Sequence, residues 1–170
     1  MKRTIFIAIA MCLFAGCTTS QQVNNDTVAS LDISRYMGEW YEIARFDHFF
    51  EHGMEHPKAT YTLREDGKVD IVNSGMKNGE LKVVKGIAKT TKHPGLLRVS
   101  FFEPFYADYR ILYIDAAYQY ALVGSGSSDY LWILARDPQL DEDGKDILLY
   151  EAICRGYDVS KFIWVEQVED

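Results

Sequence analysis

The chain is short of cysteines and of basic side chains, and each shortage narrows what the protein can be. Three cysteines among 170 residues cannot form the dense disulfide framework that holds many small secreted domains together. Lys and Arg number 18 against 25 Asp and Glu, which gives a formal net charge of −7. Nucleic-acid binding needs clustered basic residues that neutralise phosphates, so the composition argues against a nucleic-acid partner.

The chain also lacks an apolar run long enough for a transmembrane helix, which requires about 20 residues. Its longest run extends from Ile5 to Ala15 and follows two cations, Lys2 and Arg3. A cationic start followed by a short apolar segment is typical of a secretory signal peptide.

The apolar run ends in the letters LFAGC, which close on Cys17. This ending resembles the lipobox of bacterial lipoproteins. The resemblance implies that residues 1–16 are a signal peptide and that Cys17 is acylated. It also implies that Thr18 directs the protein to the outer membrane, with its domain facing the periplasm. An ordinary signal peptide with an incidental cysteine is the alternative interpretation.

Cleavage before Cys17 leaves 154 residues, a size typical of one domain. Residues 17–30 are polar and aperiodic, so we interpret them as a lipidated N-terminus and flexible tether. Residues 31–170 form the predicted domain. Cys154 is the one cysteine within it and has no intrachain partner, so the fold must depend on its core.

From residue 40 onward, short apolar runs alternate with turn signals. Asp66-Gly67 and Asn78-Gly79 favour tight hairpins because glycine tolerates positive φ. Evenly spaced short strands indicate an antiparallel sandwich or barrel, and eight strands can close around one small ligand. The runs predict strands at 40–46, 59–64, 69–74, 81–90, 96–102, 109–115, 118–125 and 130–136.

The last three predicted strands are apolar or aromatic on both faces, which means that both faces are covered. Residues 140–156 supply a cover, because acids crowd the first turn of a predicted helix and Gly156 suits its C-terminal cap. On this helix Cys154 is expected to be a packed small hydrophobic residue. A final short strand is predicted at 162–165.

Two stretches resemble the lipocalin family. GEWYEIARF, residues 38–46, is similar to the G-x-W signature, and YLWILARDP, residues 130–138, is similar to the last barrel strand with its signature arginine. RFDHFFEHG, VSFFEPFY and GYDVSKFIWV resemble the bacterial outer-membrane lipocalins in particular, although Asp115-Ala116-Ala117 replaces the family's T-D-Y turn. The resemblance covers residues 31–167. It implies an all-β fold with one helix: an eight-stranded antiparallel up-and-down barrel, a C-terminal helix packed outside it, and a short final strand.

The resemblance also assigns roles to individual residues. Gly38, Trp40 and Arg136 are the structural signature, with the arginine lying across the tryptophan at the closed end as a cation–π pair. Alternation along the strands then points further side chains inward. Alternation predicts that Ala44, Trp132 and Leu134 line the pocket. The family match adds Tyr61 on the second strand. Tyr106 is expected near the mouth, where it can offer a hydroxyl to the ligand.

The stretch FDHFFEHGMEH places a histidine at every fourth position, at His48, His52 and His56. A helix would align them, but glycine within the stretch and the following proline permit one or two turns at most. We therefore expect a lid at the mouth rather than a metal site, with histidines facing water and responding to pH. Phe46, Phe50 and Met54 are expected to face the ligand.

These observations favour binding, storage or transport of fatty acids or lysophospholipids at the outer membrane. A structural or interaction role is the alternative, with a possible homodimer and an exposed aromatic patch that includes Phe102 and Phe105. Catalysis is disfavoured because no cysteine lies on a predicted strand and no G-x-S-x-G motif occurs. No cofactor is expected.

Overall fold

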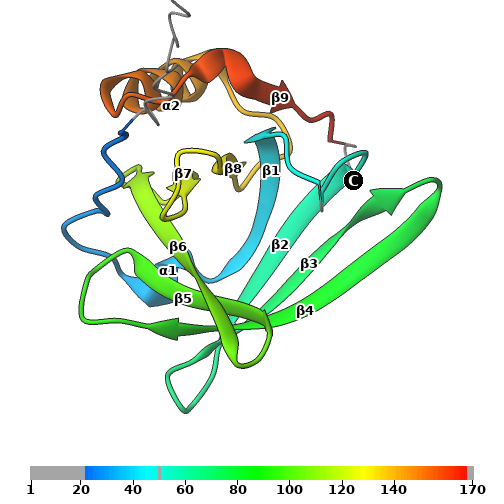
Figure 1. Ribbon diagram of the computed structural model, residues 1–170, viewed down its shortest axis with the longest axis vertical. Coiled ribbons are helices and arrows are strands. Elements are labelled where there is room, and N and C mark those ends of the chain that lie inside the picture. The colour runs from blue at the N-terminus through cyan, green and yellow to red at the C-terminus, as the bar shows by residue number, and fades with distance from the viewer. Residues whose placement is uncertain (1–21, 50, 168–170) are drawn as a thin grey trace, which may run out of the picture.

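The computed structural model describes residues 22–49 and 51–167. The predicted signal peptide, Cys17 and Phe50 lie outside the described residues. One sheet dominates the structure, with a long helix against its outer surface (Figure 1). In chain order the elements are α1 (Ile33–Tyr36), β1 (Gly38–Phe46), β2 (Glu55–Leu63), β3 (Val69–Lys77), β4 (Glu80–Thr90), β5 (Leu96–Phe102), β6 (Phe105–Ile114), β7 (Tyr120–Gly124), β8 (Leu131–Ala135), α2 (Glu142–Cys154), a 3₁₀ turn (Val159–Lys161) and β9 (Phe162–Trp164).

Each of the first seven strands pairs antiparallel with the next, and β8 pairs back with β1 to close the ring. The predicted eight-stranded up-and-down barrel is therefore confirmed. The β3–β4 hairpin turns as its sequence predicts, because Asn78 and Gly79 both have positive φ, 55° and 77°. None of the helices in the described ranges is long and apolar enough to cross a membrane.

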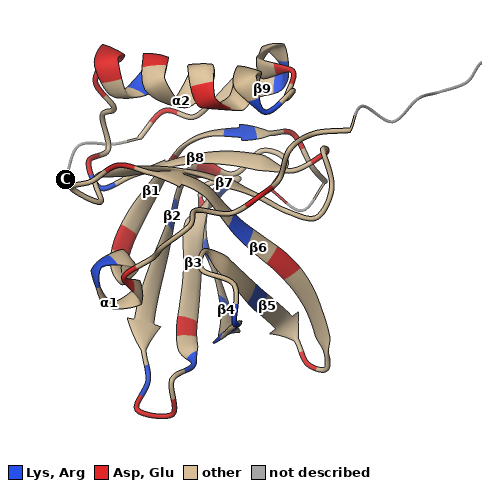
Figure 2. Ribbon diagram, turned by 90° about the vertical axis from the view of Figure 1, so that its left-hand side faces the viewer, with Lys and Arg blue, Asp and Glu red and all other residues tan. Residues whose placement is uncertain are grey.

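The two ends of the barrel differ. One end, here called the floor, carries α1 and the turns β2–β3, β4–β5 and β6–β7. The other, here called the open end, carries the loop 47–54 and the turns β3–β4, β5–β6 and β7–β8. In Figure 2 the floor lies toward the left, with α1, and the β5–β6 turn lies toward the right.

Strand β9 completes the wall beside the open end. β2 pairs with β1 from Gly38 to Tyr41, whereas β9 pairs with it from Ala44 to Phe46. The side-chain amide of Gln167 then donates to the carbonyl oxygens of Glu42 (2.7 Å) and Pro57 (3.0 Å). The C-terminal segment thus bridges β1 and β2 where these two strands diverge.

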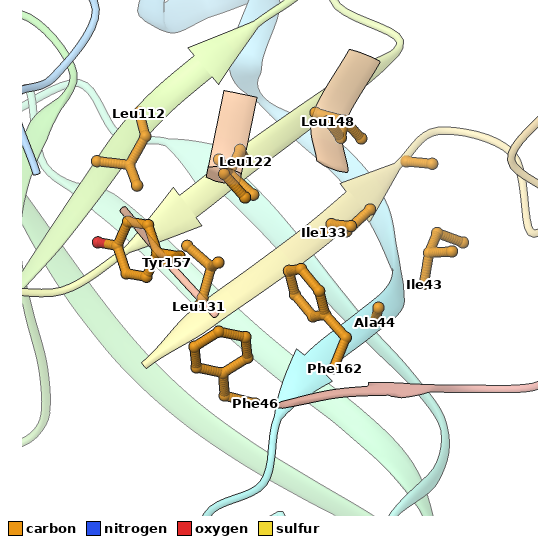
Figure 3. Close-up of a cluster of buried hydrophobic side chains, with 12 residues drawn as sticks. Ile43, Ala44, Phe46, Leu112, Leu122, Leu131, Ile133, Leu148, Tyr157 and Phe162 are labelled. Atoms are coloured by element: carbon orange, nitrogen blue, oxygen red, sulfur yellow. The ribbon is translucent and has the colours of Figure 1, made fainter. Parts of the chain in front are cut away.

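The buried apolar side chains form two clusters on opposite sides of the barrel wall. The interior cluster draws on β1 to β8 and on α1, and includes Tyr36, Trp40 and Ile111. The exterior cluster lies between β1, β6, β7, β8, β9 and α2 (Figure 3) and includes Leu122 and Leu148. The exterior cluster explains why the last three predicted strands are apolar on both faces: one face lines the barrel interior and the other packs beneath α2.

Helix α2 covers the barrel with one narrow face. Asp141 caps its first turn by accepting from the backbone N–H of Gly144 (2.7 Å), and Leu148 and Ala152 are buried beneath it. Cys154 is exposed, so the prediction that it packs as a small hydrophobic residue is wrong. It lies at the end of the helix, off the face that carries Leu148 and Ala152.

The segment before α1 differs from the flexible tether expected at residues 17–30. From residue 22 onward it lies along the outside of β6, where the N–H of Val28 donates to the carbonyl of Ile111 (3.0 Å). The N–H of Asn24 donates to the carbonyl of Arg155 (2.9 Å), and Arg110 donates to the carbonyl of Asn25 (3.2 Å). Polar composition suggested disorder here, but these hydrogen bonds hold the segment in place.

Candidate functional site

The floor of the barrel is sealed by Trp40 and Arg136. The Arg136 guanidinium carbon lies 3.9 Å from the centroid of the Trp40 ring, the geometry of a cation–π contact. The same guanidinium donates to the carbonyls of Arg35 (2.9 Å) and Met37 (2.7 Å). Gly38 gives the guanidinium room, since a Cβ there would approach it to 3.3 Å. The three signature residues therefore meet at one place.

Three tyrosines lie just above this floor. The hydroxyl of Tyr109 is 2.7 Å from that of Tyr36 and 3.0 Å from that of Tyr61. Burial raises the pKa of all three phenols, that of Tyr61 to about 12, so they are neutral at physiological pH. They form a polar but uncharged group within an otherwise apolar interior.

A buried ionic cluster lies higher in the barrel, toward the open end. Arg45 Nη1 donates to Glu42 Oε1 (2.7 Å), and both side chains are less than a tenth exposed. Glu51 Oε2 accepts from Trp132 Nε1 (3.2 Å) and lies 3.0 Å from His48 Nε2. Burial, reinforced by the charge of Glu51, raises the pKa of Glu42 to about 8, against the opposing effect of Arg45. We call these five residues (Glu42, Arg45, His48, Glu51 and Trp132) the ionic cluster.

The ionic cluster also holds the loop 47–54 in the barrel mouth. Arg45 Nη2 donates to the loop carbonyls of Glu51 (3.1 Å) and Met54 (3.4 Å). Met54 lies against Gly75 of β3 so closely that a Cβ there would come within 2.7 Å of its sulfur. The loop is therefore a lid fastened by the buried guanidinium of Arg45 and the partly buried carboxylate of Glu51.

A β-bulge in β1 creates this cluster. Glu42 pairs with Leu134, but Ala44 pairs with Ile133, so residue 43 is extra and the alternation shifts by one. Beyond the bulge Arg45 faces inward beside Trp132, while Ala44 and Phe46 face the exterior cluster. Figure 3 shows Ala44 and Phe46 among the side chains beneath α2.

The structure therefore separates the predicted pocket residues. Trp132 and Leu134 lie in the interior cluster, the side that alternation predicts, and Tyr61, favoured by the family match, lies there too. The prediction that Ala44 and Phe46 face inward is wrong, because the bulge reverses their direction.

Tyr106 lies at the open end, just after the β5–β6 turn, but its hydroxyl does not face the barrel interior. It belongs to the outer face of β6, where its ring covers Lys89 Nζ at 4.1 Å and its hydroxyl donates to Glu103. It sits an odd number of positions from Tyr109, which faces inward, and alternation turns it outward.

The three histidines have three different environments. His48 is 9% exposed and packs against the rings of Tyr130 and Trp132, so the expectation that it faces water is wrong. His52 is exposed beside Asp47 (3.3 Å), and His56 Nδ1 lies 2.8 Å from the carbonyl of Glu166. Within the described ranges no group of three potential metal ligands comes together.

Sequence reasoning missed Glu42, Arg45, Glu51, Tyr36 and Tyr109. Glu42 and Arg45 were a signal, because they lie in the middle and at the end of a nine-residue strand that is otherwise mostly apolar. Residues three apart on a regular strand face opposite sides, however, so their pairing depends on the bulge.

Several side chains of the interior cluster keep some accessible surface. Ala59, Val99, Tyr109 and Trp132 belong to the interior cluster yet are only partly buried. Their side chains are largely apolar, and the polar groups among them include the ionic cluster and the tyrosine hydroxyls. This arrangement can accommodate a long apolar group with one polar end.

Comparisons with known proteins agree with this geometry. A family model for the lipocalin-like domain matches residues 31–167. The outer membrane lipoprotein Blc of Escherichia coli K12 is 44% identical over 165 residues, which cover 94% of this chain and 93% of that protein. The Blc protein of Vibrio cholerae is 35% identical, with 97% and 99% covered. Among solved structures, the cockroach allergen Per a 4 is similar with a TM-score of 0.71 at 20% identity, covering 87% of this chain and 96% of that one.

Proposed function

The chain belongs to the lipocalin family, and from that premise we propose that it binds fatty acids or lysophospholipids inside its barrel. Lipocalins are ligand-binding and transport proteins for small hydrophobic molecules, which fits the apolar interior. We further propose that the protein stores or carries these lipids at the outer membrane, held there by acylated Cys17 with the domain in the periplasm. Support comes from relatives that are named outer membrane lipoproteins.

The observation that carries the proposal is a buried cation among apolar interior side chains. Arg45 is 3% exposed, and its Nε has no hydrogen-bond acceptor within the described part of the chain. A buried N–H without an acceptor is costly, and a ligand carboxylate or phosphate would satisfy it. With Glu42 largely protonated below about pH 8, the cluster can accept an anion beside Arg45.

The test is a calorimetric titration of the delipidated protein with oleate and with lysophosphatidylethanolamine, both below their aggregation concentrations. We expect saturable binding with about one ligand per barrel. Arg45→Met should weaken binding of both ligands about tenfold or more through loss of one charge-assisted hydrogen bond.

Arg98→Met is the matched control, because Arg98 lies on the outer face in an ion pair with Asp108. It should leave affinity unchanged. No saturable binding by the parent protein would overturn the proposal, and equal effects of the two substitutions would remove Arg45 from the site.

A second role, self-association, is favoured by a specific feature. Ile147, Tyr150 and Ile153 form an exposed apolar face on α2, away from the barrel. We propose that this face forms the contact in a homodimer. Sedimentation velocity of the parent protein and of Ile147→Ser/Ile153→Ser would show a dimer in the first and a monomer in the second; a monomeric parent would contradict it.

A further inference from the structure

Large exposed hydrophobic side chains are concentrated at the open end of the barrel. Phe49 is 86% exposed in the lid, Leu81 65% exposed after the β3–β4 turn, and Phe102 and Phe105 are 82% and 76% exposed on either side of the β5–β6 turn. At the floor, among the described residues, Leu63 at 38% is the single side chain of this kind. Exposed apolar groups gathered at one site mark a contact surface. We call Phe49, Leu81, Phe102 and Phe105 the apolar rim.

The N-terminal segment emerges at the same end. It leaves the floor at Asp32, whose N–H donates to the Tyr118 hydroxyl (2.9 Å), and follows β6. Asn25 then donates to the carbonyl of Ser125, directly after β7, and Gln22 lines a cleft with the β7–β8 turn. In Figure 2 the described segment ends on the right, the side that also carries the β5–β6 turn.

The remaining chain is too short to let the open end move far from an anchor. Cys17 is five residues before Gln22, and five residues span at most about 18 Å when fully extended. If Cys17 is acylated, the lipid surface must therefore lie close to the end of the barrel where Gln22 emerges. An anchor at the floor would turn the apolar rim away from the membrane. Because the N-terminal segment runs from the floor to the open end, the anchor instead turns the rim toward the membrane.

We propose that the apolar rim docks on the lipid bilayer that holds the acylated N-terminus, with Phe102 and Phe105 inserted among the lipids. The inference rests on the acylation of Cys17 within the proposed function. Docking removes the rim's apolar surface from water, and this contact adds to the membrane affinity that the acylated N-terminus supplies. It also sets the barrel mouth against the bilayer, so that a lipid can pass between the two without crossing water.

The test uses the full acylated chain in vesicles of phosphatidylethanolamine and phosphatidylglycerol that contain a phosphatidylcholine brominated on its acyl chains. Phe102→Trp adds a fluorophore at the rim, and Leu63→Trp adds one at the floor as the matched control. After subtraction of the parent emission, the rim tryptophan should be blue-shifted and lose most of its intensity to the bromines. The floor tryptophan should show neither change.

Equal quenching of the two tryptophans, or no quenching of the rim tryptophan, would overturn the proposal. A rim that contacts another protein molecule instead of lipid would give the second outcome. Phe105→Trp repeats the measurement on the other side of the turn if Phe102→Trp does not fold. The mass of the N-terminal peptide reports acylation separately, and the calorimetric titration reports ligand binding separately, so failure of docking is distinguishable from failure of either.

Discussion

Arg45 and Glu42 lie three residues apart on one strand, yet their side chains meet inside the barrel at 2.7 Å. On a regular strand they would face opposite sides of the wall. The extra residue between them brings both to the interior face and sends the following residues, Ala44 and Phe46, to the outer core. One bulge thus supplies the polar group of the candidate site and part of the packing beneath α2.

Removing the Glu42 carboxyl should flatten the dependence of stability on pH. The folded-state pKa of about 8 lies above the value of about 4.3 for an unfolded glutamate, so the folded protein keeps a proton that the unfolded chain releases. This contribution is fully present below about pH 4 and is lost as pH rises through about 8.

Urea unfolding of the parent should therefore show a fall in stability of at least about 1 kcal/mol from pH 5 to pH 9 that Glu42→Gln does not show. Gln keeps the shape and can still accept from Arg45. A variant with the parent's full slope would contradict the assignment to Glu42.

Replacing Arg136 should destabilise the floor. Arg136→Met removes the cation over Trp40 and leaves the carbonyls of Arg35 and Met37 without their donor. We expect a loss of about 2–4 kcal/mol in the free energy of unfolding. Arg98→Met, which breaks a half-exposed ion pair, should cost at most about 1 kcal/mol. Comparable losses in the two variants would count against a special role for the Trp40–Arg136 contact.

Cutting one fastening of the lid should loosen it. Glu51→Ala removes the acceptor of Trp132 Nε1 and the partner of His48. Limited proteolysis should then cleave the loop 47–54 faster, and bound ligand should dissociate faster. His52→Ala, which alters an exposed pair with Asp47 on the same loop, should change neither rate. If both variants behave like the parent, the ionic cluster does not hold the lid.

Gly144 should resist replacement although it lies in a helix. Alanine would gain about 1 kcal/mol in helix propensity. Its Cβ, however, would come within 2.9 Å of both the Asp141 carboxylate and the Leu140 side chain, with Tyr120 at 3.3 Å. We expect Gly144→Ala to lower the free energy of unfolding by about 1–3 kcal/mol in thermal or urea melts. Asp146→Ala on the solvent side of α2 is the control, and a stabilised Gly144→Ala protein would show that the helix start is free to shift.

Turn signals and apolar periodicity were sufficient to predict the antiparallel strands, the outer helix and the final strand, whereas the choice of a closed barrel over a sandwich came from the resemblance to lipocalins. They succeeded because each feature is local: Asn78-Gly79 specifies a turn, and two apolar faces require two layers of packing. The same alternation predicted Trp132 and Leu134 correctly, since β8 pairs with β7 without interruption.

Alternation failed where the backbone departs from it. No sequence pattern announced the bulge in β1, so Ala44 and Phe46 were given the wrong direction and Arg45 was overlooked. The segment from residue 22 was also misjudged, because its order depends on backbone bonds to Ile111 and Arg155, which are distant in sequence. His48 is buried for a similar reason: its partners Tyr130 and Trp132 come from β8 and the turn before it.

The way β1 is paired has a kinetic consequence. The first strand of the barrel bonds to β2 over one half, to β9 over the other half, and to β8 along its opposite edge. Two of these three partners lie near the C-terminal end of the chain. Pairings between such distant segments form slowly, because the entropy of closing a long loop is lost before the new contacts stabilise the chain. Until nearly the whole chain has been synthesised, β1 keeps an unpaired edge that a strand of another molecule could pair with. We therefore expect chaperone protection to matter most for the N-terminal part of the domain, which is synthesised first.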